Sequence, residues 1–179
     1  GTNPRPISNF EFFSRLGRAV INAIADTTED GRVFRVDMRL RPDGDSGPLA
    51  CSFDMLENYF ITQGREWERY AWIKARPLTG GRHDELEEIR QPFVFRKYFD
   101  FGAINAMREL HAQIRREVAK KDMADNVKLG PGGIREIEFI AQVFQLIRGG
   151  RDTPLQIKPT QRVLSLLGER GILGLDAAE

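Results

Sequence analysis

A run of eight residues near the start of the chain, RVDMRLRP at 35–42, alternates charged and apolar side chains. Successive side chains of an extended backbone point to opposite faces, so a period of two predicts a half-buried strand over residues 33–40. One face of that strand is apolar. The other face carries a single carboxylate, Asp37, among three guanidinium groups.

The charged face has two interpretations. A strand holds side chains of one face rigidly, about 7 Å apart, which suits a metal ligand or a general base at Asp37. Mg²⁺ prefers one or two carboxylates plus phosphate oxygens, and planar guanidinium groups such as Arg39 and Arg41 bind two phosphate oxygens at once. Alternatively, Asp37 neutralises its arginine neighbours on a solvated face, where each pair stabilises by less than ~1 kcal/mol. The periodicity alone leaves both open.

The overall composition narrows the class of protein. With 179 residues, 41% hydrophobic and 30% charged, the chain can form a core as one domain or two small ones. The 27 basic and 26 acidic residues nearly cancel, which argues against a nucleic-acid partner. The one cysteine, Cys51, excludes an internal disulfide and fits a reducing, cytoplasmic setting. No apolar run approaches the roughly 20 residues of a membrane span.

The chain is predicted to be helical outside the first strand and a short second one at 49–51. Ser8 and Ser52 are suitable N-caps for helices over 9–25 and over FDMLENYFITQ. Apolar spacing predicts further helices over 65–76, 83–95, Asp100 to about Lys121, from the GPGG loop (130–133) to about Arg148, and 160–170. A break near residues 78–90 is the candidate boundary between an α/β part and a helical part.

Other polar residues in the predicted helices are candidates for a site. Lys74 and Arg76 at the end of the 65–76 helix suit phosphate, although the residues taken alone favour core packing with a solvated basic edge. Glu138 and Gln142 are one turn apart and can face one site together, but a carboxylate on so apolar a helix needs a partner. The GPGG loop offers backbone N–H groups to an anion, or is a plain helix entry.

The order of the motifs along the chain indicates a protein family. VDMRLRPDGDSGPL, then SFDMLENYFITQGREWERYAWIKAR, then KLGPGGIREIEFIAQVFQLIRGGR strongly resemble the bacterial glutamine synthetase adenylyltransferase/adenylyl-removing enzymes, over roughly residues 9–172. The resemblance implies an α+β fold: residues 1–80 as the C-terminal portion of a DNA polymerase beta-like nucleotidyltransferase domain with an incomplete sheet, and residues 81–179 as a helical domain. It places Asp37 on the third acid of the family's metal site, whose Gly-Ser-Asp-x-Asp motif is expected upstream of residue 1.

The wording of the motifs is closest to the N-terminal, adenylyl-removing half. The resemblance therefore implies a cytoplasmic, Mg²⁺- or Mn²⁺-dependent enzyme in which inorganic phosphate removes AMP from a glutamine synthetase tyrosine, giving ADP. Asp37 is then catalytic and a metal ligand. Arg39, Arg41, Lys74 and Arg76 hold phosphate or nucleotide, with Glu138 and Gln142 behind them. The PII signal protein is an expected partner.

Two alternatives stay open. The chain can belong to the adenylyl-adding half, which uses ATP, or its helices can be a non-catalytic docking module for glutamine synthetase or PII. Without the upstream acids, we expect the metal affinity of these residues alone to fall sharply.

Overall fold

The computed structural model describes residues 6–98 and 126–174, apart from 129 and 131, together with residues 102, 105, 108, 109, 112 and 116. Backbone contacts divide the chain into unit 1, residues 1–62, and unit 2, residues 63–179. The helix α3 thus belongs to unit 2, and the predicted domain boundary between residues 80 and 81 stays a prediction. In the described part of the chain, no helix is long and apolar enough to cross a bilayer.

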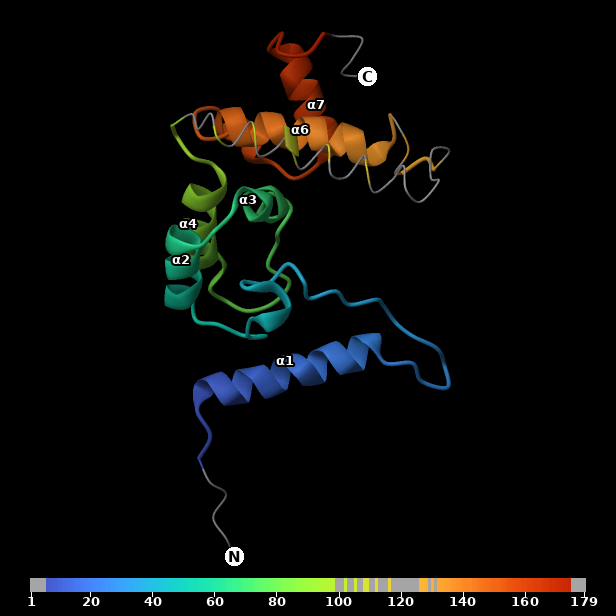
Figure 1. The fold of residues 1–179 in the computed structure, drawn as a ribbon, viewed down its shortest axis with the longest axis vertical. Coiled ribbons are helices and arrows are strands. Elements are labelled where there is room, and N and C mark those ends of the chain that lie inside the picture. Colours follow the sequence, from blue (N-terminus) through green and yellow to red (C-terminus); the bar gives the residue numbers. More distant parts are fainter. Residues whose placement is uncertain are drawn as a thin grey trace, which may run out of the picture. The chain divides into compact units, whose positions relative to one another are not determined.

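Unit 1 begins with the helix α1 (Asn9–Ala25), which matches the predicted bounds (Figure 1). The Ser8 hydroxyl accepts a hydrogen bond from the Glu11 backbone N–H at 3.1 Å and so caps the first turn. None of the residues of α1 is buried. Its apolar residues lie about half exposed, namely Phe10, Phe12, Phe13, Leu16 and Val20. α1 is therefore an amphipathic helix whose apolar stripe is only partly covered.

The described residues contain no β-strand, so the strands predicted at 33–40 and 49–51 do not form. A strand needs a neighbour that exchanges backbone hydrogen bonds with it. Here the Phe34 N–H donates to the Ile24 carbonyl at the end of α1, and the Arg41 N–H donates to the Met38 carbonyl in a turn. Alternation without a neighbouring strand leaves Phe34 69% exposed. The helical part of the predicted fold is confirmed, while its sheet portion is not.

Unit 1 ends with a turn and a second helix. The turn contains a short 3₁₀ helix, η1 (Gly44–Ser46), entered through Asp43 in the left-handed region at φ 58°. α2 (Phe53–Thr62) follows, with the Ser52 hydroxyl accepting from the Met55 N–H at 3.2 Å, as its capping role predicted. The Tyr59 hydroxyl of α2 accepts a hydrogen bond from the Asp43 N–H at 3.2 Å, which ties the turn to the helix.

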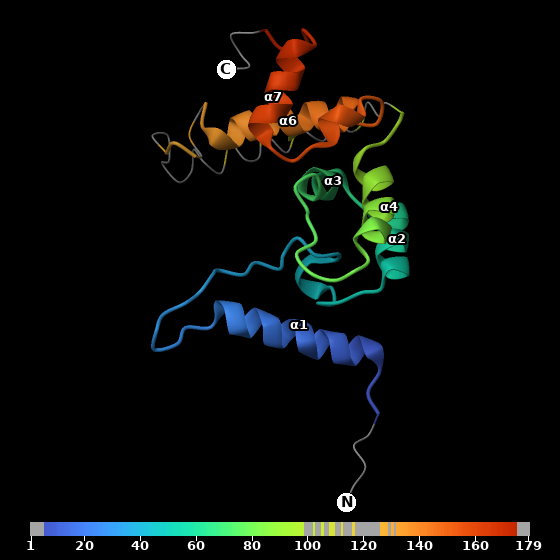
Figure 2. The same ribbon diagram turned by 180° about the vertical axis from the view of Figure 1, so that it is seen from behind.

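Unit 2 contains α3 (Glu66–Trp72), α4 (His83–Val94), α6 (Ile134–Arg148), the 3₁₀ helix η2 (Thr153–Gln156) and α7 (Thr160–Glu169). Figures 1 and 2 show α7 crossing α6, and these helices enclose the core of the unit. Ala141 of α6 packs there with three fully buried residues, namely Leu155, Val163 and Leu167. The helix predicted from Asp100 to about Lys121 lies mostly outside the described residues.

α3 ends at Trp72, earlier than the predicted residue 76. The next N–H groups, of Ile73, Lys74 and Ala75, bond three residues back instead of four, so the helix tightens and stops. Pro77 disfavours helical geometry in the residue before it. The Trp72 carbonyl, which accepts the Ala75 N–H at 3.3 Å, also accepts a hydrogen bond from Arg90 of α4 at 3.1 Å.

Candidate functional site

Asp37 in unit 1 is exposed and lies between the side chains of Arg39 and Arg35. Its Oδ1 accepts hydrogen bonds from the backbone N–H and Nε of Arg39, at 3.1 and 3.0 Å, and its Oδ2 accepts from Arg39 Nη2 at 2.6 Å. The Arg35 guanidinium lies 3.9 Å from Oδ2. Side chains two apart along the chain thus meet on one side of the backbone, as the alternation predicted, although no strand forms there.

The Arg39 side chain, and then its backbone N–H, hold the pKa of Asp37 well below its usual range. The same hydrogen bonds raise the pKa of Arg39. Asp37 is therefore an anion at neutral pH and cannot donate a proton there. It orients Arg39, while the Arg35 side chain beside it stays 77% exposed. Arg35, one of the three arginines on the predicted charged face, is thus a second cation beside Asp37.

Arg41 holds the turn that follows. Its Nε, Nη1 and Nη2 donate to three backbone carbonyls, of Gly47, Met38 and Asp45, at 3.0, 2.7 and 2.9 Å. The side chain is only 16% exposed. Because every nitrogen of the guanidinium has a carbonyl partner, the geometry gives Arg41 a structural role. Its predicted role in phosphate binding stays a prediction.

In unit 2, Lys74 ties the end of α3 to the start of α7. Its ammonium donates to the Lys158 carbonyl at 2.6 Å and to the Thr160 hydroxyl at 2.7 Å, and lies 4.0 Å from a carboxylate oxygen of Glu138. Two of the three donors of the ammonium group are thus hydrogen-bonded, and Glu138 adds an ion pair. Lys74 therefore joins segments more than eighty residues apart, which no local sequence pattern signals.

Glu138 and Gln142 of α6 lie in different environments. Glu138 is the partner of Lys74 and, after burial itself, the main cause that raises the pKa of Tyr70 to about 12. Gln142 is only 5% exposed, and its amide has no hydrogen-bonding partner among the described residues. The structure brings Glu138 to Lys74, but gives no contact that places Gln142 in the same site.

Arg76 is exposed and has no ion-pair partner within the described part of the chain. It belongs to a basic group that includes Lys158 and the buried Arg90. The pKa of Lys158 is lowered first by burial and then by the positive charges of Arg90 and Arg76, which Glu87 partly opposes. Lys158 was missed in the sequence, because its basic neighbours are far away along the chain.

The described residues do not form a metal centre by themselves. No cluster of three or more acidic, histidine or cysteine side chains occurs among them, and both oxygens of Asp37 already accept from Arg39. At the GPGG loop before α6, the Glu136 carboxylate accepts a hydrogen bond from the Gly132 N–H at 2.9 Å. It therefore occupies one of the N–H donors that a bound anion would use.

Comparison with known proteins places the chain in a family. Residues 2–91, which are half of the chain, match the sequence model of glutamate-ammonia ligase adenylyltransferase. The chain belongs to this adenylyltransferase family. Residues 108–179 match a second model, GlnD PII-uridylyltransferase.

Among the relatives is the bifunctional glutamine synthetase adenylyltransferase/adenylyl-removing enzyme of Aromatoleum aromaticum, 76% identical over 93% of this chain and 18% of its own length. The proteins of the same name from Chromobacterium violaceum and Neisseria meningitidis serogroup B are 63% and 60% identical, each over 94% of this chain and 19% of their own length. The chain thus spans about a fifth of the length of the curated relatives it matches, and the resemblance seen in its motifs is confirmed.

Proposed function

We propose that the chain is part of a nucleotidyltransferase that removes AMP from a glutamine synthetase tyrosine, with inorganic phosphate as the attacking group and ADP as the product. The observation that carries this proposal is the agreement between the relatives, named for adenylyl addition and removal, and the ordered motifs that surround Asp37. The exposed cations beside that carboxylate support it, since the reaction brings two anions together.

In this reaction an oxygen of inorganic phosphate forms a bond to the phosphorus of AMP, and the bond from that phosphorus to the tyrosine oxygen breaks. Arg39 is held by Asp37 through its Nε and Nη2, which leaves its Nη1 without a partner among the described residues, and Arg35 is largely exposed. Both can offset the repulsion between the phosphates. Arg41 would first have to leave its three carbonyls, so it is the weaker candidate for phosphate contact.

In unit 2 the same reasoning favours Arg76 over Lys74 for the nucleotide, because the Lys74 ammonium already has three oxygen partners. A requirement for Mg²⁺ or Mn²⁺ is part of the proposal, drawn from the family resemblance. The described residues do not form a metal centre by themselves. Adenylylated glutamine synthetase, ATP or ADP and the PII protein are the proposed partners.

The test replaces Asp37 in the full-length enzyme that carries this segment. We expect Asp37→Asn to abolish phosphate-dependent release of ADP from adenylylated glutamine synthetase while the circular dichroism spectrum is unchanged. Asp30→Asn is the matched control, because Asp30 is an exposed acid of the same segment without an ion pair among the described residues. It should release ADP at the wild-type rate.

The other outcomes separate the alternatives. Loss of AMP addition with AMP removal intact would assign the chain to the adenylyl-adding half. Near-normal addition and removal in Asp37→Asn would refute a catalytic role for this carboxylate and favour a docking module.

A further inference from the structure

The Arg41 guanidinium is held by the backbone of a single turn. Its three nitrogens donate to the carbonyls of Met38, Asp45 and Gly47, at 2.7, 2.9 and 3.0 Å. The Arg41 backbone N–H also donates to the Met38 carbonyl, at 3.2 Å. Arg41 therefore bonds both ends of the turn, Met38 where the turn begins and Gly47 where it ends.

The Met38 carbonyl connects Arg41 to the Asp37 carboxylate. This carbonyl and the Arg39 N–H belong to one planar peptide group. The Arg39 N–H donates to Asp37 Oδ1 at 3.1 Å, while the carbonyl of the same group accepts from Arg41 Nη1. Arg41 and Asp37 thus bond opposite sides of one rigid peptide group. Rotation of that group would move its N–H away from the carboxylate, so the Arg41 bonds fix the N–H that orients Asp37.

The turn itself has little room to rearrange. A Cβ atom at Gly47 would lie 1.8 Å from the Pro42 carbonyl oxygen, so the backbone approaches itself there at a distance that only glycine allows. The Gly47 N–H donates to the Gly44 carbonyl at 3.2 Å. The Asp43 N–H donates to the Tyr59 hydroxyl, which anchors the turn on α2. The turn is thus a stiff support for the residues that precede it.

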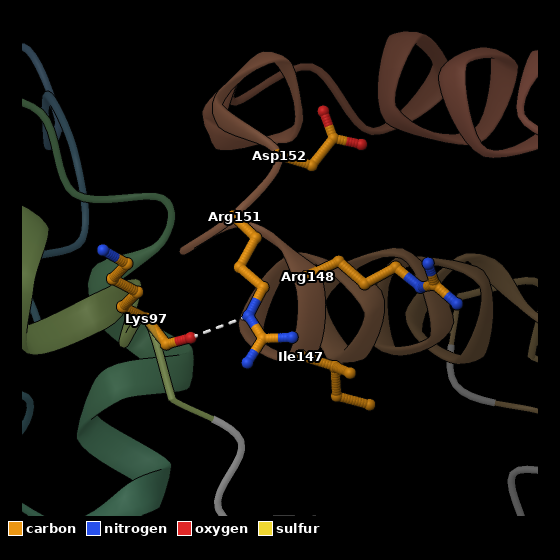
Figure 3. Close-up of a pocket in the computed structure, with 5 residues that line it drawn as sticks. All are labelled: Lys97, Ile147, Arg148, Arg151 and Asp152. Carbon is orange, nitrogen blue, oxygen red and sulfur yellow. Dashed lines mark hydrogen bonds between the residues drawn. The ribbon is translucent and has the colours of Figure 1, made fainter.

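The arginines at the end of α6 differ from Arg41. At a cavity of about 320 Å³, Arg151 donates its Nε to the Lys97 carbonyl, and the Arg148 side chain points in another direction (Figure 3). The Arg151 bond joins two segments that are 54 residues apart. Arg41 instead bonds carbonyls three, four and six residues away, so its effect is on the local backbone.

We propose that Arg41 is a positioning residue for the reaction at Asp37, in which it fixes the peptide group between Met38 and Arg39 and does not contact phosphate. This role rests on the function proposed above, because it needs Asp37 to lie at the reacting groups. Loss of the Arg41 bonds lets the carboxylate, and the Arg39 side chain that it holds, move relative to the substrate. A shift of about 1 Å can lower a rate about a hundredfold.

The test compares Arg41→Lys and Arg41→Gln in the full-length enzyme that carries this segment. Lysine keeps the charge, but its single nitrogen cannot replace the planar fork that reaches three carbonyls. We expect both variants to lower kcat for phosphate-dependent ADP release about tenfold to a hundredfold, and to change the KM for inorganic phosphate less than about twofold. Arg18→Lys and Arg18→Gln, at an exposed position of α1, are the matched controls and should keep the wild-type kcat.

A direct contact between Arg41 and phosphate predicts a different pattern. The KM for phosphate then rises in Arg41→Gln, and Arg41→Lys retains most of the activity because it keeps the charge. That pattern would overturn the positioning role.

Hydrogen exchange followed by mass spectrometry measures the turn in the same full-length variants. We expect the peptide that spans residues 38–47 to exchange faster in Arg41→Lys than in the wild type. α2 should exchange as in the wild type, which shows that the variant is folded. Equal exchange of residues 38–47 in the variant and the wild type would also overturn the positioning role.

The positioning role and the proposed function fail separately. If Asp37→Asn abolishes ADP release while Arg41→Lys has a normal kcat, the role of Arg41 is wrong and the proposed function stands. If both substitutions lower kcat for AMP addition and leave AMP removal intact, the role of Arg41 stands and the proposed removal reaction is wrong.

Discussion

Replacement of Arg69 is the most demanding test of how unit 2 holds together. This side chain is 2% exposed and joins α3 to the end of α4. Its Nε and Nη2 donate to the Phe93 and Val94 carbonyls, each at 3.1 Å, and its Nη1 lies 2.5 Å from a carboxylate oxygen of Glu66. Those carbonyls belong to the last turn of α4, where no helical N–H is left to bond them.

Arg69→Met fills a similar volume but removes every donor. It leaves two carbonyls without this partner and separates a buried ion pair, a change that typically costs about 3–5 kcal/mol. Glu66 keeps Arg96 at 3.3 Å, so we expect the lower end, about 3 kcal/mol of the free energy of unfolding. For a chain of this size that corresponds to a fall in melting temperature of roughly 6–12 °C.

Urea denaturation followed by circular dichroism measures this loss directly. Arg162→Met is the matched control: that arginine is 60% exposed, its pair with Glu169 spans 3.5 Å, and its removal should change stability by less than about 0.5 kcal/mol. If Arg69→Met costs no more than about 1 kcal/mol, like an exposed ion pair, then Arg69 does not hold α3 to α4 as described.

Two predictions concern ionisation. In an alkaline absorbance titration Tyr70 should ionise at a pKa of about 12, and Tyr70→Phe should remove the phase at that pH; an unchanged curve would contradict the assignment. Because the folded pKa of Tyr70 is raised, its contribution to stability is complete below about pH 10 and is lost as the pH rises towards 12. Arg39→Gln should raise the pKa of Asp37 towards its ordinary value, since Arg39 supplies the largest lowering interaction. A carboxyl NMR titration measures this shift, and an Asp37 that titrates as in wild type would refute the arrangement.

Local signals were sufficient for most helices. Ser8 and Ser52 cap the helices that they were predicted to cap, because an N-cap hydroxyl bonds an N–H only two or three residues away. The long apolar pattern after GPGG produced α6 with its predicted end at Arg148. The family, too, was evident from the order of the motifs alone, and the relatives confirm it.

The partners of individual side chains were decided only by the tertiary structure. The alternation at 33–40 correctly placed Asp37 beside its arginines, but a strand also needs a neighbouring strand, which the described residues do not supply. Arg41 and Lys74 read as candidates for phosphate, yet both donate chiefly to protein oxygens. A basic side chain has the same sequence signature whether its acceptor is a ligand or a distant carbonyl, and only the fold brings that carbonyl within reach.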